Sequence, residues 1–373
     1  MKGVLTKMEN TLLSIQNSFR PKANYSNAPT NKLYKGDIVM VMSDVPNGKA
    51  LAKCFIIDQD DTYSLNQRIC CIRSKDFDTK YLYYQLNRHE HFLAFNNGEN
   101  QTNLRKDDIL DCPLIKPSME EQRKMVDELD NILKKIEKAK SNIETNQNNT
   151  QELIDGYLQN CFSSTDSNWE TKPINALFEI KPPKSEAKKA LKYNDIVSFL
   201  PMEDLEVMNF EITATKEKQL GSVVKSYTYF AENDVLLAKL TPCFENGKIG
   251  IARNLKNNIG FGSSEYIVFR STGVVIPEYL YFFLSRPQFR TEGKKLMTGA
   301  VGHKRISKDW IENYPLPYPK SISTQTEIVE KLKVLSQEAV KLNVLYQKKL
   351  DTLTDLKDGL LKRAFENELI EAE

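Results

Sequence analysis

Apolar side chains recur at alternating intervals of four and three residues along two long stretches of this chain. The first stretch runs from Met125 to Tyr157 and the second from Ile328 to Leu360. This spacing is the a/d pattern of a heptad repeat, so each stretch predicts a helix of roughly 50 Å with one apolar seam. The predicted seam positions include Met125, Leu129, Ile132, Ile136, Ile143, Asn146, Leu153, Ile328, Leu332, Leu335, Leu342, Lys349, Leu353 and Leu356.

The two seams share one register, because Leu332 follows Leu129 by 203 residues and the other seam positions keep that offset. A polar residue interrupts each seam, Asn146 in the first and Lys349 in the second. Charged residues crowd the remaining faces, so each helix is expected to lie largely in water and to pack along its seam. We therefore expect the two helices to pack against each other in antiparallel orientation. The polar interruptions either fix the helix register or form two notches that suit docking of a partner.

The segments before the two long helices repeat one order of elements. Each contains a turn and strand, a second turn, a short amphipathic helix, a polar loop and a Pro-Leu segment. The first copy also contains a β-type run, Gln67–Ile72. The matched segments are Gly36–Met42 with Asn233–Leu237, Asn47–Lys49 with Asn246–Lys248, Tyr81–Leu86 with Tyr279–Leu284, Asn103–Ile109 with His303–Ile311, and Pro113–Leu114 with Pro315–Pro317.

This repeat predicts an α+β fold with two pseudo-repeated mixed α/β domains, separated by two long helices that pack as an antiparallel coiled coil. The predicted divisions are residues 1–117, 118–163, 164–322 and 323–366, in the order domain, helix, domain, helix. Only 35 residues precede Gly36, whereas about 70 separate Phe162 from Asn233. The first domain is therefore expected to be shortened on its N-terminal side, where Asn24–Lys32 has the composition of a loop.

The composition is that of a globular protein, with 27% charged residues, 40% hydrophobic residues and a net charge of +2. No stretch approaches 18 consecutive apolar residues, so no membrane span is expected. The N-terminus lacks the pattern of a secretion signal, and the six cysteines form no C-x-x-C pair. These features favour a cytoplasmic protein with reduced thiols.

The motifs of common catalytic sites are missing from the sequence. It contains no phosphate-binding P-loop, no catalytic tetrapeptide of amino-methyltransferases and no acidic nuclease motif. The three histidines, His89, His91 and His303, are too few and too scattered to predict a metal or nucleophile site. We therefore expect a non-catalytic binding protein without a metal or cofactor.

The order of these motifs, present twice with a heptad helix after each copy, resembles the specificity subunit of type I restriction–modification systems. The resemblance covers roughly residues 36–373. It implies two target recognition domains, each reading one half of an interrupted sequence in double-stranded DNA. It also implies that the paired helices set the spacing of the half-sites and dock two copies of the methyltransferase subunit. A restriction subunit would join them, and methylation and cleavage would reside in these partners.

Candidate DNA-contacting residues are the basic and amide side chains of the polar loops and turns, because such groups bind phosphates and base edges. The paired loops 101–106 and 298–305 combine several of them, and the second contains glycines that permit close approach of the backbone. The candidates are Lys49, Lys53, Arg68, Gln101, Asn103, Arg105, Lys106, Lys239, Lys248, Arg253, His303, Lys304 and Arg305.

Two other functions are compatible with the same residues. The chain is alternatively a protein–protein scaffold with two binding domains on a coiled coil, unrelated to DNA. The second alternative is a degraded or phase-variable allele that reads only one half-site. DNA binding separates the first alternative from a specificity subunit, and footprinting separates the second.

Overall fold

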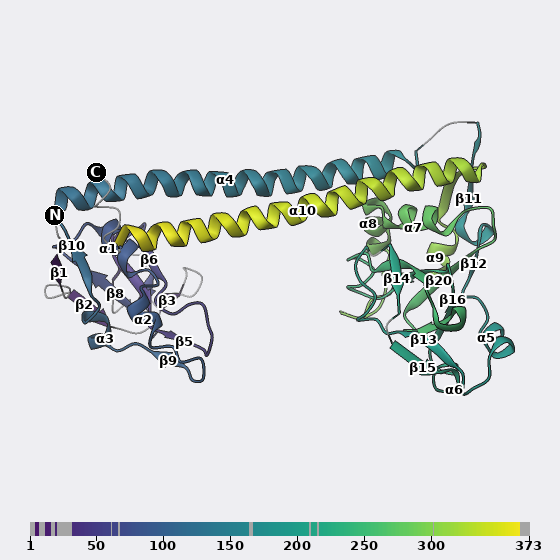
Figure 1. Cartoon of the computed structure of the whole chain (residues 1–373), viewed down its shortest axis with the longest axis horizontal. Helices are drawn as coiled ribbons and strands as arrows, with labels where there is room; N and C mark the ends of the chain where they lie inside the picture. Colours follow the sequence, from purple (N-terminus) through teal and green to yellow (C-terminus); the bar gives the residue numbers. More distant parts are fainter. Residues whose placement is uncertain are drawn as a thin grey trace. The chain divides into compact units, whose positions relative to one another are not determined.

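The computed structural model describes residues 4–6, 12–15, 19–20, 32–60, 62–65, 68–163, 167–208, 210–214, 216–300 and 302–365 (Figure 1). The chain forms two compact units. Unit 1 comprises Met1–Glu144 with Gln347–Glu373, and unit 2 comprises Thr145–Tyr346. The predicted loop at Asn24–Asn31 and the predicted strand residue Gln67 lie outside the described residues, and the sequence-based domain limits stay a prediction.

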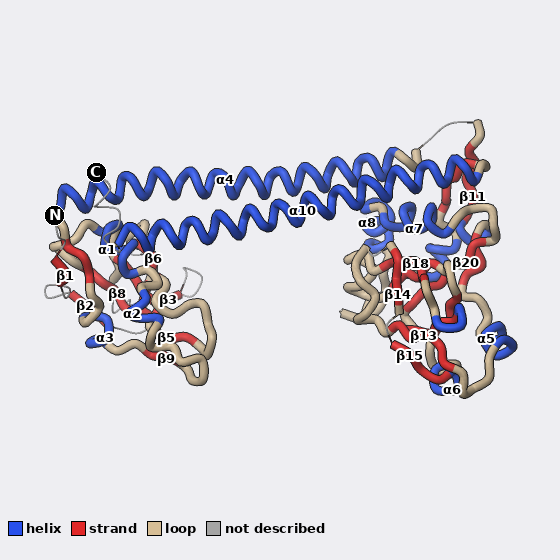
Figure 2. The backbone as a smooth tube through the Cα atoms, in the orientation of Figure 1, coloured by secondary structure: helices blue, strands red, loops and turns tan. Residues whose placement is uncertain are grey.

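The two predicted long helices are confirmed as α4 (Met119–Asn160) and α10 (Ile322–Phe365) (Figure 2). Each unit contains the first part of one helix and the last part of the other. In unit 1, Glu137 Oε1 lies 3.0 Å from Lys357 Nζ, and Lys140 Nζ donates to Thr354 Oγ1 at 2.9 Å. Residue numbers rise along α4 as they fall along α10, so the packing is antiparallel, as predicted.

The structure corrects part of the predicted seam. Leu129, Ile136 and Leu332 are buried, whereas Ile132, Leu153 and Leu356 are 40%, 75% and 54% exposed. The same position of the heptad fails each time, because an α-helix has 3.6 residues per turn and a neighbouring position faces inward instead. The remaining predicted positions Met125, Ile143, Ile328, Leu335, Leu342 and Leu353 are half-buried.

The inward positions next to the exposed ones are Leu133 and Ile154, which are half-buried. They directly follow Ile132 and Leu153. Because two apolar residues are adjacent at each of these places, the sequence is compatible with two helix registers that differ by one residue. Asn146 and Lys349 are exposed and lie outside the seam, so they do not form polar interruptions within it.

Unit 1 is built on a four-stranded antiparallel sheet of order β2-β8-β4-β6. Its core packs Met40, Cys70 and Ile72 of the sheet against Tyr81 and Leu82 of the helix α1. The elements of this unit are β1 (Val4–Thr6), β2 (Leu12–Ile15), β3 (Phe19–Arg20), β4 (Ile38–Val41), β5 (Ser43–Asp44), β6 (Cys54–Ile56), β7 (Ser64–Leu65), β8 (Ile69–Arg73), α1 (Thr79–Leu86), α2 (Glu90–Leu93), β9 (Thr102–Asn103), α3 (Lys106–Leu110) and β10 (Leu114–Lys116).

Unit 2 contains a five-stranded sheet of order β12-β20-β17-β18-β14 and a four-stranded sheet of order β15-β13-β19-β16. Aromatic side chains of α7, among them Tyr279 and Phe283, fill the core against the first sheet. The elements are β11 (Trp169–Pro173), β12 (Phe178–Ile180), α5 (Ser185–Ala190), β13 (Ile196–Leu200), β14 (Glu211–Thr213), β15 (Lys216–Gln219), α6 (Leu220–Val223), β16 (Thr228–Ala231), β17 (Val235–Ala238), β18 (Ile249–Arg253), β19 (Ile259–Gly262), β20 (Tyr266–Ser271), α7 (Pro277–Ser285), α8 (Pro287–Lys295), α9 (Lys308–Glu312) and β21 (Pro315–Pro319).

In each unit, two neighbouring strands of the main sheet are joined by the same ion pair, between a buried aspartate and an arginine. Asp37 precedes β4 and binds Arg73 of β8 through two hydrogen bonds of 2.5 Å. Asp234 precedes β17 and binds Arg270 of β20 through bonds of 2.9 and 2.7 Å. The two aspartates are 5% and 1% exposed. The turn-and-strand motif recognised in the sequence therefore fixes the same sheet pairing in both units.

A buried glutamine anchors the start of each long helix. Gln122 accepts a hydrogen bond from the backbone N–H of Asp78 at 2.8 Å, and Gln325 accepts one from Ile276 at 3.0 Å. Each side-chain amide also donates to the carbonyl of the proline that precedes its helix, at 3.1 and 2.9 Å. These contacts attach each helix to the domain that it follows in the chain.

An aromatic residue at the end of each long helix attaches it to the other domain. Phe365 packs edge-on against Tyr81 with ring centres 5.4 Å apart, and Phe162 packs the same way against Tyr279 at 5.0 Å. Tyr279 Oη donates to the carbonyl of Pro317 at 2.9 Å. The buried Tyr81 Oη has no hydrogen-bond partner among the described residues.

This difference predicts unequal effects of removing the two hydroxyl groups. Tyr279→Phe is expected to lower the free energy of unfolding of unit 2 by about 1 kcal/mol, because it leaves the Pro317 carbonyl without its donor. Tyr81→Phe is expected to be neutral or stabilising, because it removes a buried polar group that lacks a partner. Thermal unfolding of both variants measures the effects, and equal losses of stability would contradict the prediction.

Candidate nucleic-acid interface

Val41, the last residue of β4, and Met42, which follows it, join three segments that contain candidate DNA-contacting residues in unit 1. Val41 N–H donates to the carbonyl of Lys53 at 3.0 Å, and Met42 N–H donates to that of Arg68 at 2.7 Å. The N–H of Leu104, inside the predicted loop 101–106, donates to the carbonyl of Met42 at 2.7 Å. Segments that are distant in sequence therefore meet at one end of the sheet.

Unit 2 repeats this arrangement at the end of β17. The backbone N–H of Ala238 donates to the carbonyl of Lys248, and the N–H of Lys239 donates to the backbone carbonyl of Glu265, both at 3.0 Å. The backbone carbonyl of Lys239 in turn accepts a hydrogen bond from the N–H of Ile306, also at 3.0 Å. Leu104 therefore corresponds to Ile306, so the predicted loops 101–106 and 298–305 coincide in part, with residues 101–103 equivalent to residues 303–305.

The same hydrogen bonds correct one predicted equivalence. The sequence pairs Asn47–Lys49 with Asn246–Lys248, whereas in the structure Lys53 is the counterpart of Lys248. Ala52 is accordingly the counterpart of Gly247, and both have left-handed backbones, with φ of 55° and 79°. The predicted equivalence rested on the sequence Asn-Gly-Lys, which occurs in both units. It is wrong because the connection from β4 to β6 differs in length from the connection from β17 to β18.

In unit 1 the strands β5 and β9 hold the predicted amide side chains next to each other. Ser43 pairs with Asn103, and the amide of Gln101 donates to Ser43 Oγ at 2.8 Å. Asn103 is exposed, and so are Lys49, Lys53, Arg68, Arg105 and Lys106. No ion pair with a described acidic residue engages Lys49, Lys53, Arg105 or Lys106, so these four cations are available to a ligand.

In unit 2 the predicted loop forms a hairpin closed by Thr298 and Arg305, whose backbones exchange hydrogen bonds of 3.1 and 2.8 Å. Gly299 has φ of +127°, and a Cβ atom there would lie 2.9 Å from the carbonyl oxygen of His303. The hairpin tip therefore requires a glycine at this position. His303 and Lys304 are exposed beside the tip, and Val301 lies outside the described residues.

Other predicted cations of unit 2 are engaged within the protein. Arg305 forms two hydrogen bonds with Glu265, at 2.9 and 2.8 Å, and these hold the pKa of Glu265 below its ordinary value. Lys239 lies 3.9 Å from the same carboxylate. Arg253 pairs with Glu278, and Lys248 Nζ donates to the carbonyl of Met202 at 2.9 Å. These side chains position the interface. His303 and Lys304 are the exposed members of the predicted set in unit 2 that form no ion pair with a described residue.

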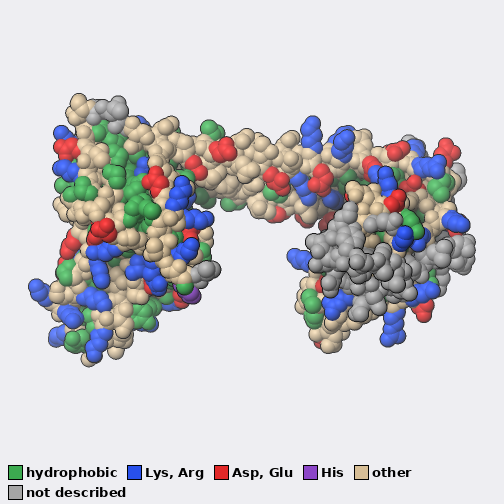
Figure 3. Space-filling model, turned by 180° about the vertical axis from the view of Figure 1, so that it is seen from behind, with side chains coloured by type: hydrophobic (Ala, Val, Ile, Leu, Met, Phe, Trp, Pro, Cys, Tyr) green, Lys and Arg blue, Asp and Glu red, His purple; other side chains and the backbone are tan. Residues whose placement is uncertain are grey.

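The lysines of the turn that follows β12 were not among the predicted DNA-contacting residues. Lys181 and Lys184 line a cleft of about 240 Å³ that also includes Lys239 and Lys308. Figure 3 shows Lys and Arg side chains over a wide part of the unit 2 surface. The Lys-Pro-Pro-Lys sequence was a possible signal, but the strands that complete the cleft lie more than 40 residues away in the chain.

Two features are absent from the part of the chain that the structure describes. The described residues contain no group of three or more His, Cys, Asp or Glu side chains with the placement needed to hold a metal ion. Within the same residues, no helix is both long enough and apolar enough to span a bilayer.

Comparisons with known proteins agree with this organisation. The sequence profile described as the type I restriction modification DNA specificity domain matches residues 14–145 and 166–350. The EcoEI specificity subunit of Escherichia coli is 38% identical over 135 residues, which are 36% of this chain and 22% of that protein. The EcoAI specificity subunit of Escherichia coli is 32% identical over 197 residues, which are 50% of this chain and 32% of that protein. The matched regions thus span less than a third of the length of each relative.

Two solved structures share the fold. One, from work on complex assembly and conformational transition of the type I R-M system, has a TM-score of 0.70 at 15% identity and covers 92% of this chain and 85% of its own. The HsdS subunit from Thermoanaerobacter tengcongensis has a TM-score of 0.53 at 16% identity, covering 92% of this chain and 84% of its own. Since the matching profile covers most of the sequence in two copies, the chain belongs to the type I restriction modification DNA specificity domain family.

Proposed function

We propose that this chain is the non-catalytic specificity subunit of a type I restriction–modification complex and that each of its units reads one half of a bipartite DNA site. The observation that carries the proposal is the repeated arrangement at the ends of β4 and β17. In each unit it presents one loop with accessible cations, Arg105 and Lys106 in the first and Lys304 in the second. Such side chains bind phosphates and base edges.

The two units differ at equivalent positions of this arrangement, as readers of two different half-sites would. Arg68 in unit 1 corresponds to Glu265 in unit 2. The backbone carbonyl of each accepts a hydrogen bond from the backbone N–H of the residue that follows the strand, Met42 after β4 and Lys239 after β17. Asn103 likewise corresponds to Arg305. Different side chains at equivalent positions shape the two interfaces differently, and Glu265 does so by holding Arg305, so the two half-sites are proposed to differ in sequence.

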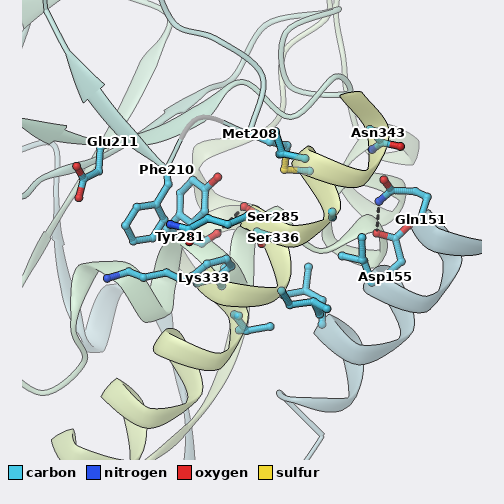
Figure 4. A pocket seen from close by; sticks show the side chains of 18 residues that line it. Gln151, Asp155, Met208, Phe210, Glu211, Tyr281, Ser285, Lys333, Ser336 and Asn343 are labelled. Carbon is cyan, nitrogen blue, oxygen red and sulfur yellow. Dashed lines mark hydrogen bonds between the residues drawn. The ribbon is translucent and has the colours of Figure 1, made fainter. Parts of the chain in front are cut away.

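Two equivalent grooves support docking of two methyltransferase subunits. In unit 2 a groove of about 540 Å³ lies between the helix α7 and the long helices, with Asp155 and Leu158 in its wall (Figure 4). In unit 1 a groove of about 480 Å³ lies between α1 and the end of α10, where Asp358 and Leu361 take the corresponding places. Two similar grooves suit two copies of one partner. A restriction subunit would complete this assembly, and we place the assembly in the cytoplasm.

Exposed apolar side chains on the long helices point to the same partners. In unit 2, Leu153 is 75% exposed, and Val340 and Val344 are each 64% exposed. Val340 and Val344 are four residues apart on α10 and so lie next to each other on its surface, and adjoining exposed apolar side chains of this kind favour a protein contact. The partner subunits are therefore proposed to bind partly through these helices.

Salt dependence of DNA binding tests the proposed function. The chain, purified with its methyltransferase, is expected to bind one interrupted duplex in a gel-shift assay of genomic fragments. Its affinity should fall roughly a thousandfold or more between 50 and 200 mM salt if at least about six phosphates are contacted. Binding without the methyltransferase is expected to be weaker. An absence of DNA preference in both preparations would favour the scaffold, and footprinting of a single half-site would favour the degraded allele.

A further inference from the structure

A basic cleft in unit 2 lies beside the predicted DNA-binding hairpin. It is formed by the turn after β12, the start of β16 and the residues around Ser264, and its volume is about 240 Å³. Four lysines line the cleft together with the hydroxyl-bearing side chains of Ser226 and Thr228, and its lining contains no acidic residue. The cleft therefore has the charge and the hydrogen-bond donors that suit an anion.

Two of the four lysines have no carboxylate partner among the described residues. Lys308 pairs with Glu312 at 2.7 Å, and Lys239 lies 3.9 Å from Glu265. Lys184 Nζ instead donates to the backbone carbonyl of residue 225 at 3.1 Å, and Lys181 is exposed. Acidic residues near the cleft are thus engaged by other cations, which leaves the charges of Lys181 and Lys184 uncompensated.

This like-charged arrangement is unfavourable without a ligand. Partial burial lowers the pKa of Lys184, and the positive charges of Lys181 and Lys188 lower it further. A bound anion would stabilise the protonated amine and remove the repulsion. Removing this repulsion between the lysines therefore contributes favourable free energy to binding of the anion.

The backbone holds the two lysines in a fixed turn. Lys181 has a left-handed backbone with φ of 61°, and its N–H donates to the carbonyl of Val268 at 2.9 Å. Pro182 and Pro183 follow, and each restricts its own φ angle. A lysine at this backbone conformation is strained relative to glycine, and such strain is more common at binding sites than elsewhere.

Lys239 connects the cleft with the segment that follows the hairpin 298–305. Lys239 contributes its side chain to the cleft, and its carbonyl accepts the hydrogen bond from Ile306 that positions the hairpin. Lys308, the first residue of α9, lies two positions further along the chain. A nucleic-acid strand that contacts Lys304 therefore has a basic surface beside it.

We infer that this cleft binds a phosphate group of the DNA backbone, held by the ammonium groups of Lys181 and Lys184. The inference rests on the proposed function and adds a specific site to it. A lysine acts on phosphate as a flexible point charge, so this contact would strengthen binding to every sequence and fix the position of the strand without reading bases.

Single substitutions test the site in the complete complex with methyltransferase. Lys181→Gly removes the charge and keeps a residue that favours the left-handed backbone, so its thermal midpoint should not fall below that of the wild type. Lys184→Gln retains a polar side chain of similar length. Each variant is expected to reduce the slope of log affinity against log salt, and the two substitutions together should reduce it by about 0.9, the value for one phosphate contact. The ratio of affinities for the preferred and a scrambled duplex should stay unchanged.

Lys189→Gln is the matched control, because Lys189 is an exposed lysine of α5 outside the cleft. Its salt slope should equal that of the wild type. A wild type that binds no DNA would overturn the proposed function together with this inference. Wild-type binding with unchanged slopes in both cleft variants, or an equal reduction in the control, would overturn the inference alone.

Inorganic phosphate and a mononucleotide identify the source of the phosphate group. Calorimetric titration of the DNA-free complex should give at most weak, millimolar binding of either compound, since one phosphate contact supplies only part of the DNA affinity. Tight mononucleotide binding that Lys181→Gly abolishes, with an unchanged salt slope for DNA, would instead make the cleft a nucleotide site and contradict the inference.

Discussion

Replacing Arg270 with alanine is expected to lower the free energy of unfolding of unit 2 by about 3 kcal/mol or more, the largest stability effect predicted for this chain. Arg270 forms two hydrogen bonds with Asp234, at 2.9 and 2.7 Å, and Asp234 is only 1% exposed. Removing one member of a buried ion pair leaves the other charge without compensation, and this costs more than the pair itself contributes. Denaturant unfolding of the variant and the wild type measures the loss.

The pH dependence of this loss identifies its cause. Burial already raises the pKa of Asp234 above its ordinary value, and the hydrogen bond from Arg270 opposes that rise. In the Arg270→Ala variant the pKa of Asp234 is therefore expected to rise further. A raised pKa means that the folded state binds more protons than the unfolded state, so stability falls as the pH rises through the interval above about 4. The deficit of the variant should thus be largest near pH 7 and should shrink as the pH approaches 4.

A surface ion pair of the same unit provides the control. Lys256 lies 3.9 Å from Glu217, and both side chains are more than half exposed. Lys256→Ala should change the free energy of unfolding by less than about 1 kcal/mol at either pH. A similar loss in both variants would show that Arg270 contributes no more than a surface charge.

The long helices were the most predictable part of the fold, because a heptad pattern over 33 residues leaves few alternatives (residues 125–157). Their inner faces were less predictable. Ile132 is followed by Leu133 and Leu153 by Ile154, so the pattern fitted two registers that differ by one residue. Contacts with the partner helix select between such registers, and hydrophobic spacing alone does not contain them.

The paired loops 101–106 and 298–305 were found from the repeat, because both the order and the polarity of the segments recur. The equivalence of Ala52 with Gly247 was not found, since an alanine gives no sequence signal of a left-handed backbone. The cleft around Lys181 was missed for another reason. Its walls come from five separate segments that only the fold brings together.

Replacing Arg105 and Lys106 together with alanine is expected to have the largest effect on DNA binding. Both side chains are exposed at the start of α3, with no described acidic partner. Hydrogen bonds that involve a charged group contribute about 1.5–3 kcal/mol each, so loss of both contacts should lower the affinity at least about a hundredfold. The salt slope should decrease by about 1.8 if each side chain contacts one phosphate. Footprinting should show loss of protection over one half-site only.

The fold of unit 1 is expected to tolerate these two substitutions. The carboxylate of Asp108 accepts its hydrogen bond from the backbone N–H of residue 105, at 2.6 Å, and this contact does not depend on the side chain. Arg123 and Lys124, an exposed pair in the first turns of α4, allow a control with the same change of charge. Alanines at these two positions should leave both half-sites protected, provided that the methyltransferase still co-elutes. If the control weakens DNA binding as much as the loop variant, total charge determines the affinity, and loop 101–106 has no specific part in reading the half-site.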